Sequence, residues 1–195
     1  MKKVILLVAV AMMAVTGVNA QSEIKQEIAV SYGTLSNSDW LNIFESVIGA
    51  VFGETYEEGS YVGPIGMEYF YHVKPWCGVG AIATYGHLIQ DSSKDDNKVG
   101  TKTDRYTTLM PAVKFDWLRR EAVSLYSKLG AGVTWRQEKR EFEGDNAQYN
   151  SDKTEAHFNW QVSLLGVEAG KRLRGFAELG FGEQGLFIAG VRYRF

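Results

Sequence analysis

The feature that most constrains this chain is a period-two alternation of apolar and polar residues that runs, with few breaks, from about residue 60 to the end. Successive side chains of a β-strand point to opposite faces, so this alternation predicts strands with one apolar and one polar face. In the last segment the apolar members are Phe187, Ala189, Val191, Tyr193 and Phe195, and the members between them are Ile188, Gly190, Arg192 and Arg194. The alternation predicts an all-β protein.

About eight such segments follow one another, which is the number of strands in the smallest transmembrane barrels. The expected strands are Glu27–Gly33, Tyr61–Lys74, Trp76–Gln90, Arg105–Trp117, Val123–Arg136, the stretch from Phe158 to the turn at Gly170–Leu173, Gly175–Phe181 and Phe187–Phe195. Long polar connections at Thr34–Gly59, Asp91–Lys102 and Glu138–Asp152 take turns with short ones. This asymmetry predicts an eight-stranded antiparallel up-and-down transmembrane β-barrel with both termini at the short-turn end.

The polar face of these strands carries charges of both signs. The charged members are Glu27, Glu68, Lys114, Asp116, Lys128, Glu178, Arg192 and Arg194. Ionised side chains on the lipid face would cost about 2–4 kcal/mol each at the membrane midplane. An eight-stranded barrel has an interior just wide enough for side chains. We therefore expect these residues to form a charge network in the lumen, with the apolar face toward lipid and its aromatic residues in two interfacial bands.

The first 20 residues have the organisation of a cleaved secretory signal. Met1–Lys3 is basic, Val4–Val15 is apolar, and Val18–Ala20 offers small residues to a signal peptidase. The apolar run is too short for a membrane-spanning helix, which needs about 20 residues. We expect a signal peptide at 1–20 and a single barrel domain at 21–195, located in the outer membrane of a Gram-negative cell.

Composition excludes several other classes. The formal net charge of −2 at pH 7 gives no basic footprint for nucleic acid, and the single cysteine, Cys77, excludes an intramolecular disulfide framework. Gly78–Ala83 loosely matches a dinucleotide-binding fingerprint, but its glycines lie within a predicted strand and precede no helix. Asp91–Asn97 lacks the spacing and glycine of a dedicated calcium loop. We expect no cofactor and no metal.

The first long connection contains a predicted helix at Asp39–Gly53. Its apolar residues at helical spacing are Trp40, Phe44, Val47, Ile48, Val51 and Phe52. Either Ser38 or Asp39 is a suitable N-cap. Such a helix in an outer loop could lie on the membrane surface, cover the barrel mouth or dock a partner, because an apolar patch of this size is rarely left in water.

Two histidines near the outer loops are weak candidates for catalytic residues. His87 precedes Ser92 and Ser93, and His157 shares a face with Asn159. A general base must come within hydrogen-bond reach of its nucleophile, and the sequence alone does not establish that geometry. Asn159 stands where the serine of a His-x-Ser-Asn pattern would be, so an enzyme remains the alternative hypothesis and ordinary strand-end histidines the simpler one.

Two hairpins allow a prediction of register. Pairing Phe181 with Phe187 leaves a short loop ending in Gly185, where a glycine suits the left-handed position. This register places Glu178 diagonal to Arg192, with both side chains in the lumen, and predicts an ion pair between them. In the hairpin around Pro75, the register places Phe70 opposite Gly80. Near Leu164–Leu165 the alternation does not decide which residues face inward, and this predicts a β-bulge.

The ending Gly190–Phe195, together with Leu125–Gly130 and Gly175–Gly182, resembles small outer-membrane barrels of the OmpX/OmpA-like class, especially those of Bacteroidetes. Mature chains of that group often begin with Gln, as Gln21 would here. The resemblance implies that Val191, Tyr193 and Phe195 form a signal read by the barrel-assembly machinery. It also implies outer-membrane lipids and lipopolysaccharide as surroundings.

The resemblance further implies a non-enzymatic structural or adhesive role, with the outer loops contacting a host or envelope surface ligand. A lipid-modifying enzyme similar to lipid A deacylases is the alternative. A narrow channel is disfavoured because an eight-stranded barrel leaves no open lumen.

From the apolar outer face we predict a strand-rich protein that stays folded in detergent, because detergent replaces the lipid that this face requires. Unboiled samples should migrate differently from boiled samples on gel electrophoresis. Recovery of a soluble, monomeric, mainly helical protein without detergent would contradict the barrel.

Overall fold

The computed structural model describes residues 25–39, 55–57, 61–94, 97–142 and 150–195. These residues form nine strands. The strands are β1 (Gln26–Thr34), β2 (Thr55–Glu57), β3 (Tyr61–Lys74), β4 (Cys77–Lys94), β5 (Asn97–Arg119), β6 (Val123–Phe142), β7 (Ser151–Gly170), β8 (Leu173–Gly182) and β9 (Phe187–Arg194).

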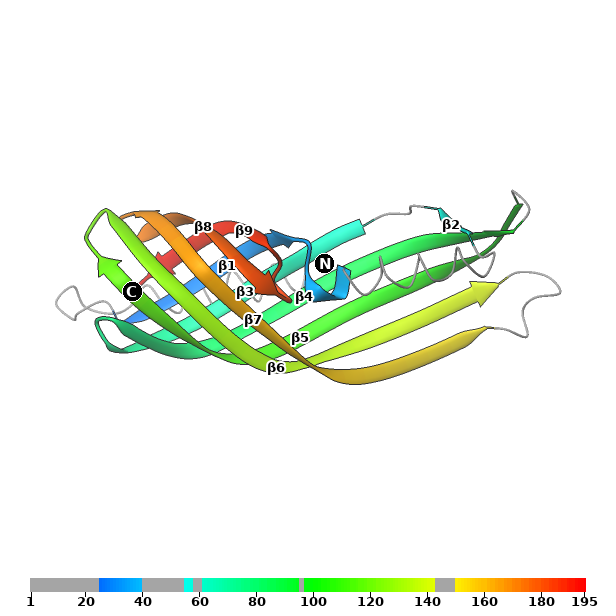
Figure 1. Cartoon of the computed structure of the whole chain (residues 1–195), viewed down its shortest axis with the longest axis horizontal. Coiled ribbons are helices and arrows are strands. Elements are labelled where there is room, and N and C mark those ends of the chain that lie inside the picture. Colours follow the sequence, from blue (N-terminus) through cyan, green and yellow to red (C-terminus); the bar gives the residue numbers. More distant parts are fainter. Residues whose placement is uncertain (1–24, 40–54, 58–60, 95–96, 143–149) are drawn as a thin grey trace.

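Eight of these strands close into a ring (Figure 1). Each is antiparallel to its neighbours, in the order β1-β3-β4-β5-β6-β7-β8-β9, and β9 returns to pair with β1. The short β2 joins the outer part of β4. The predicted eight-stranded antiparallel up-and-down barrel is therefore confirmed. In the part of the chain that the structure describes, no helix is long and apolar enough to cross a membrane.

The first and last described strands meet at the end that carries the short turns. The amide N of Gln26 donates to the carbonyl O of Phe195 over 3.0 Å, and the amide N of Phe195 donates to the carbonyl O of Gln26 over 2.9 Å. The turns at this end connect β3 to β4, β5 to β6 and β7 to β8 with two or three residues each. We call it the short-turn end.

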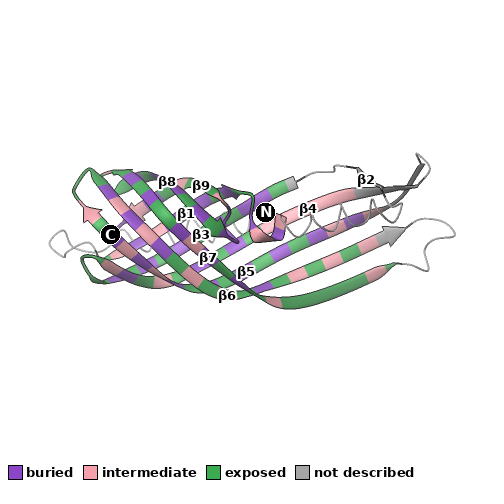
Figure 2. Cartoon of the chain, in the orientation of Figure 1, coloured by how far each residue is buried: buried purple, intermediate pink, exposed green. Residues whose placement is uncertain are grey.

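Burial alternates along the strands, as Figure 2 shows. In β8 every second residue from Arg174 to Gly182 is buried and the residues between them are exposed. The exposed members of the ring are mostly apolar, among them Tyr69, Leu129, Leu179 and Val191. Because soluble proteins rarely leave so continuous an apolar surface in water, this outer face favours an apolar solvent.

Four strands continue beyond the ring. β4, β5, β6 and β7 have 18, 23, 20 and 20 residues, whereas β1, β8 and β9 have 9, 10 and 8. Figure 1 shows the long strands leaving the barrel on one side. We call this part, residues 86–94, 97–106, 136–142 and 151–157, the protruding sheet.

The protruding sheet corrects two sequence predictions. Asp91–Lys102 and Glu138–Asp152 were expected to be polar loops, but most of their described residues continue β4, β5, β6 and β7 in antiparallel pairing, with one register shift between Ser92 and Ser93. A strand with polar residues on both faces shows no apolar–polar alternation, because the alternation arises only where one face meets an apolar environment. Such a strand therefore cannot be recognised from this pattern. Threonine-rich stretches such as that around Thr103 nevertheless favour extended backbone.

The predicted bulge in β7 is confirmed. The register with β8 shifts between Ser163 and Leu165, so Leu164 and Leu165 are both exposed. Beyond the bulge the parity is reversed, and Gly166 and Glu168 face the interior.

The predicted register of the last hairpin is wrong, whereas that of the hairpin at Pro75 is right. Phe187 pairs with Leu179 instead of Phe181, and Phe70 lies opposite Gly80 as expected. Gly185 does take a positive φ of 109°, but it belongs to a wider connection than expected. Glu183 and Gln184 in that connection bind residues inside the barrel, and these tertiary bonds outweigh the preference for a tight turn.

The described start of the first connection shows a reciprocal helix cap. The amide N of Asp39 donates to Ser36 Oγ over 3.2 Å, and the amide N of Ser36 donates to Asp39 Oδ2 over 2.6 Å. The cap is therefore Ser36, not Ser38 or Asp39 as predicted. The apolar positions predicted for this helix (Trp40, Phe44, Val47, Ile48, Val51 and Phe52) and the predicted signal at 1–20 lie outside the described residues.

Two glycines of the ring provide a matched test of interior packing. A Cβ at Gly166 would lie too close to the buried ring of Tyr126, whereas a Cβ at Gly175 would meet nothing within 4 Å. We expect Gly166→Ala to lower the free energy of unfolding by about 1–3 kcal/mol, because the ring cannot move away in a filled interior. Gly175→Ala should change it by less than about 0.5 kcal/mol. Urea unfolding in micelles measures both, and equal losses would contradict the packing described.

Candidate functional site

The middle of the barrel is filled with side chains. Phe70, Ile82, Met110 and Tyr126 are completely buried there. Because a ring of eight strands has room only for side chains, these residues fill the lumen at this level.

Ten charged side chains also occupy the interior, and we call them the lumen network. Its members are the carboxylates Glu27, Glu68, Asp116, Glu168 and Glu178 and the cations Lys114, Lys128, Arg174, Arg192 and Arg194. All ten are buried. Five negative and five positive charges balance, which is the condition under which buried ions are tolerated.

Arg192 lies at the centre of the network. Its Nη1 is 2.7 Å from Glu168 Oε2 and its Nη2 is 2.8 Å from Glu68 Oε2. Its guanidinium also stacks on Phe176, with 4.6 Å between the Cζ atom and the ring centroid. A Cβ at Gly190 would meet this ring at 2.8 Å, so Gly190, which lies on β9 opposite Phe176, makes room for the stack.

The other cations connect strands that are distant in the sequence. Lys114 Nζ lies 2.7 Å from Glu27 Oε1, and Lys128 Nζ lies 2.9 Å from Glu178 Oε2 and also contacts Glu68. Arg194 pairs with Glu168 and, over 3.2 Å, with Glu27. The network therefore joins β1, β3, β5, β6, β7, β8 and β9 through the lumen.

All eight residues that the sequence places in the lumen lie in this network: Glu27, Glu68, Lys114, Asp116, Lys128, Glu178, Arg192 and Arg194. The predicted partnership of Glu178 with Arg192 is a minor contact at 3.8 Å, because Glu178 lies opposite Ile188 instead of Gly190. Glu178 is held mainly by Lys128, by the hydroxyl of Tyr126 at 2.7 Å and by that of Ser163 at 2.6 Å.

Sequence reasoning missed two interior residues and the partner of a third. The parity change at the bulge concealed Glu168, and Arg174 lies between the predicted turn at Gly170–Leu173 and the strand predicted from Gly175. His72 shares the interior face of β3 with Glu68 and Phe70, and its Nε2 lies 2.8 Å from Asp116 Oδ2. Gly78 lies opposite His72 on β4, the strand between β3 and β5, and leaves space for the imidazole to reach Asp116. A glycine opposite a histidine in the predicted hairpin is a feature of the sequence that indicates such a contact.

The connection between β8 and β9 folds into the outer end of the barrel. Glu183 accepts hydrogen bonds from Ser38 Oγ over 2.7 Å and from Asn159 Nδ2 over 2.8 Å. Gln184 donates to Glu68 Oε1 over 2.8 Å and so touches the lumen network. Burial raises the pKa of Glu183 above the usual carboxyl range, although these donors act in the opposite direction.

The two histidines proposed as weak catalytic candidates lie on different strands. His87 is in β4 and His157 is in β7, with β5 and β6 between them. The Nε2 atoms of both are buried without a hydrogen-bond partner among the described residues. No described hydrogen bond brings either imidazole to a serine or a carboxylate. In the same described part, no group of three or more His, Cys, Asp or Glu residues could hold a metal ion.

The outer surface changes character where the protruding sheet begins. Leu109, Trp135 and Phe158 are exposed at neighbouring positions on β5, β6 and β7, and Phe158 is 71% exposed. Further along the same outward faces the residues become polar: Thr103, Arg105 and Thr107 on β5, Gln137 and Lys139 on β6, and Asp152 and Thr154 on β7. The boundary between an apolar and an aqueous solvent therefore falls at this level.

The inner face of the protruding sheet carries its own ion pairs. Asp104 Oδ1 lies 3.1 Å from Arg136 Nε, and Arg136 Nη2 lies 3.4 Å from Glu138 Oε2. Arg140 Nε follows at 2.7 Å from Glu138 Oε1. One face of this part of the sheet is charged and the other is polar, so both faces suit an aqueous solvent.

One edge of the protruding sheet has no partner strand in the part that the structure describes. β7 pairs with β8 only as far as Gln161, so residues 151–158 pair with β6 alone. The carbonyl O of Trp160 accepts a bond from the Glu183 amide on the β8 side. Because backbone direction alternates along a strand, Phe158, Ala156, Thr154 and Asp152 also direct their N–H and C=O groups to that open side.

These features define a closed eight-stranded β-barrel with an ion-paired interior, an apolar outer surface and a polar sheet projecting from one end. Three solved structures of the Ail protein of Yersinia pestis are similar to it. One is described as the attachment invasion locus protein in complex with the heparin analogue sucrose octasulfate; it is 14% identical, with a TM-score of 0.47, and covers 88% of this chain and 97% of its own. A second structure of Ail, 15% identical with a TM-score of 0.43, has the same coverage.

The third structure is the outer membrane protein Ail in a phospholipid bilayer nanodisc. It is 16% identical, with a TM-score of 0.38, and covers 89% of this chain and 100% of its own. No protein-family model matches the chain, and no curated protein matches it in sequence.

The lumen network predicts which pairs of charges are energetically coupled. Removing one partner of a buried ion pair leaves a lone charge, so Lys128→Met or Glu178→Gln alone should each cost about 3–5 kcal/mol of unfolding free energy, and the double variant should cost less than the sum. Urea unfolding in micelles measures this cycle.

The combination of Glu178→Gln with Arg192→Met serves as the matched control for that cycle. Because these two groups are 3.8 Å apart and each has closer partners, their coupling energy should be smaller than that of Lys128 with Glu178. Stronger coupling between Glu178 and Arg192 would overturn this assignment of partners.

Proposed function

We propose that this chain is an integral outer-membrane β-barrel that acts without catalysis, as a binder of proteins at the cell surface. The apolar band of the ring would face the lipid, the short-turn end the periplasm, and the protruding sheet the outside. The protruding sheet supports this orientation, since in such barrels the extracellular part is long, whereas the turns at the other end have two or three residues each. The neighbours of the apolar band would then be outer-membrane lipids and lipopolysaccharide.

The observation that carries the binding role is the open edge of β7. Residues 151–158 present backbone donors and acceptors above the apolar band, on a strand that β6 holds on its other side. An unpaired strand edge of this length is a ready template for an added strand, and natural proteins normally protect such edges.

The occupant that fits this edge is an extended segment of a partner protein. Backbone hydrogen bonds would provide the affinity, and the side chains along the edge the selectivity. Asp152, Lys153 and Glu155 place charges of both signs beside it, while Phe158 offers an exposed aromatic ring at its base. A polysaccharide has no repeating backbone N–H and C=O groups to continue the ladder, so a protein is the better match.

The assembly of the barrel fits the same proposal. Val191 is exposed on the outer face of β9, and the rings of Tyr193 and Phe195 stack with centroids 6.0 Å apart at the short-turn end. These three side chains would form the signal read by the barrel-assembly machinery. The OmpX/OmpA-like and Bacteroidetes resemblance and the signal peptide remain predictions.

The test compares cells that carry the wild-type barrel, Thr154→Pro or Thr154→Ala. Proline removes an edge-facing N–H without touching the β6 ladder, whereas alanine removes only the side chain. We expect binding of cells to immobilised proteins to fall about fivefold or more with Thr154→Pro, the equivalent of one lost hydrogen bond, and to persist with Thr154→Ala. Equal binding by both variants, or binding to polysaccharides alone, would refute strand addition.

A topology control accompanies this experiment. In a Cys77→Ala background, a membrane-impermeant maleimide should label Thr103→Cys in the protruding sheet on intact cells and leave Arg172→Cys in the β7–β8 turn unlabelled. The opposite pattern would reverse the proposed orientation. Loss of the difference in migration between unboiled and boiled samples would identify a variant that fails to fold.

A further inference from the structure

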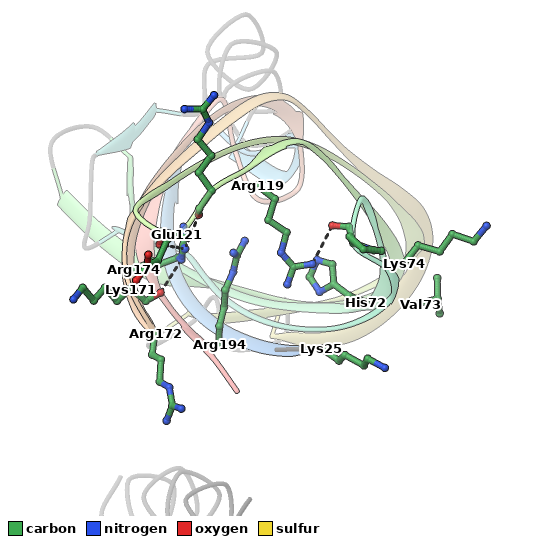
Figure 3. A pocket seen from close by; sticks show the side chains of 12 residues that line it. Lys25, His72, Val73, Lys74, Arg119, Glu121, Lys171, Arg172, Arg174 and Arg194 are labelled. Atoms are coloured by element: carbon green, nitrogen blue, oxygen red, sulfur yellow. Dashed lines mark hydrogen bonds between the residues drawn. The ribbon is translucent and has the colours of Figure 1, made fainter. Parts of the chain in front are cut away.

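The short-turn end of the barrel contains a cavity of about 600 Å³. Its walls are the three short turns and the strand ends beside them, at the end of the ring opposite the protruding sheet, and Figure 3 shows the lining side chains. Eight of its twelve lining residues are Lys or Arg, and a single one, Glu121, is acidic. A cavity of this volume can hold a small molecule.

The positive charge of this cavity is not needed inside the barrel. Of the eight cations, Arg174 and Arg194 belong to the lumen network, where five carboxylates already balance five cations. The other six lining cations are Lys25, Lys74, Arg119, Arg120, Lys171 and Arg172, and the lining contains one acidic residue, Glu121. Like charges gathered at one rim repel, and an anion in the cavity would relieve that repulsion.

The cations are arranged in two tiers. Figure 3 shows Arg119 and Arg194 reaching toward the barrel axis, whereas Lys74 and Arg172 point away from it. Arg119 Nη1 donates to the carbonyl O of Pro75 over 3.0 Å, which fixes its guanidinium beneath the β3–β4 turn. The planar guanidinium fork matches the oxygens of a phosphate group in two places at once.

Arg174 holds the two turns that carry most of the other cations. Its Nη2 donates to the carbonyl O atoms of Arg120 and Glu121 over 3.2 and 2.6 Å, and its Nε donates to that of Lys171 over 2.9 Å. The turns between β5 and β6 and between β7 and β8 are thereby tied together. The backbone of these two turns, from which most of the rim cations extend, is therefore held in place by Arg174.

A second feature of the wall points to a ligand. His72 lines the cavity with its side chain only 2% exposed, and its Nδ1 is buried without a hydrogen-bond partner in the described structure. Its Nε2 is engaged by Asp116 at 2.8 Å. Buried polar atoms are almost always satisfied, so an unsatisfied one in the wall of a basic cavity marks a place for a bound group.

We propose that this cavity binds phosphate-bearing anions at the short-turn end of the barrel. Its chemistry selects for multiply charged groups, because several fixed cations surround a volume large enough for two phosphates. Only the assignment of the cavity to the periplasmic side rests on the proposed function. The phosphates could come from a soluble compound or from lipid headgroups of the adjoining leaflet, which the outward-pointing Lys74 and Arg172 would meet.

The test is titration of the purified full chain with inorganic pyrophosphate in an uncharged detergent, followed by calorimetry. Arg119→Gln should weaken binding about tenfold, the expected effect of losing one charge-assisted bond. The double variant Lys171→Gln/Arg172→Gln changes exposed turn residues and tests the site even if Arg119→Gln fails to fold. It too should weaken binding about tenfold.

The matched control is Arg105→Gln/Lys139→Gln, which removes two positive charges from the outer face of the protruding sheet. Its affinity for pyrophosphate should stay within about twofold of wild type, since screening limits the effect of charges so far away. An equal loss in this control would show non-specific attraction and overturn the site. Absence of measurable binding at low ionic strength would overturn it as well, without bearing on the binding of proteins to β7.

The source of the phosphate is determined by repeating the titration in bilayer nanodiscs. If phosphatidylglycerol weakens pyrophosphate binding relative to uncharged phosphatidylcholine, headgroups occupy the site. If the two bilayers give the same affinity, the ligand is a soluble phosphate compound. Both results support the cavity as a phosphate site, because each requires pyrophosphate to bind.

Discussion

The structure depends on the neutralisation of charge inside a narrow cylinder. A ring of eight strands encloses just enough space for side chains, so a charged residue in it has little water to solvate it. The five carboxylates and five cations of the lumen network solve this problem by pairing with one another. Gly166, Gly190 and Gly78 supply the space that Tyr126, Phe176 and His72 require to complete the packing. Because the interior holds the polar groups, the exterior can be apolar.

The same strands pass through two different solvents. Within the ring the outward faces of β5, β6 and β7 carry Leu109, Trp135 and Phe158, and beyond it they carry threonines and charges. The hydrogen-bonded register continues across this boundary without interruption. The barrel therefore doubles as a rigid support, and the open β7 edge is held in place by the ring below it. A binding edge on such a support loses little conformational entropy when a partner adds a strand.

Period-two alternation was sufficient to predict the ring, the orientation of its faces and eight of the ten members of the lumen network, because side-chain direction in a strand follows from parity alone. The prediction failed where a bulge shifts the alternation of inward and outward residues, and where the strands pass from an apolar to an aqueous solvent. The bulge at Leu164–Leu165 concealed Glu168, and a turn boundary concealed Arg174. The protruding sheet lacks an apolar face and so resembled a loop. The register of the last hairpin depends on bonds from Glu183 and Gln184 to distant residues, and no local turn rule contains that information.

The position of two network cations has a consequence for how such a barrel closes. Arg192 and Arg194 both belong to the last strand, and their partners include Glu27 of the first strand, 167 residues before Arg194. Without β9, the remaining network holds five carboxylates against three cations. An unfinished chain would therefore expose both an open strand edge and an uncompensated negative lumen, and the arrival of β9 removes the two defects together. Ring closure and charge balance are thus coupled, because the same strand completes both, and a chain without its final strand keeps both defects.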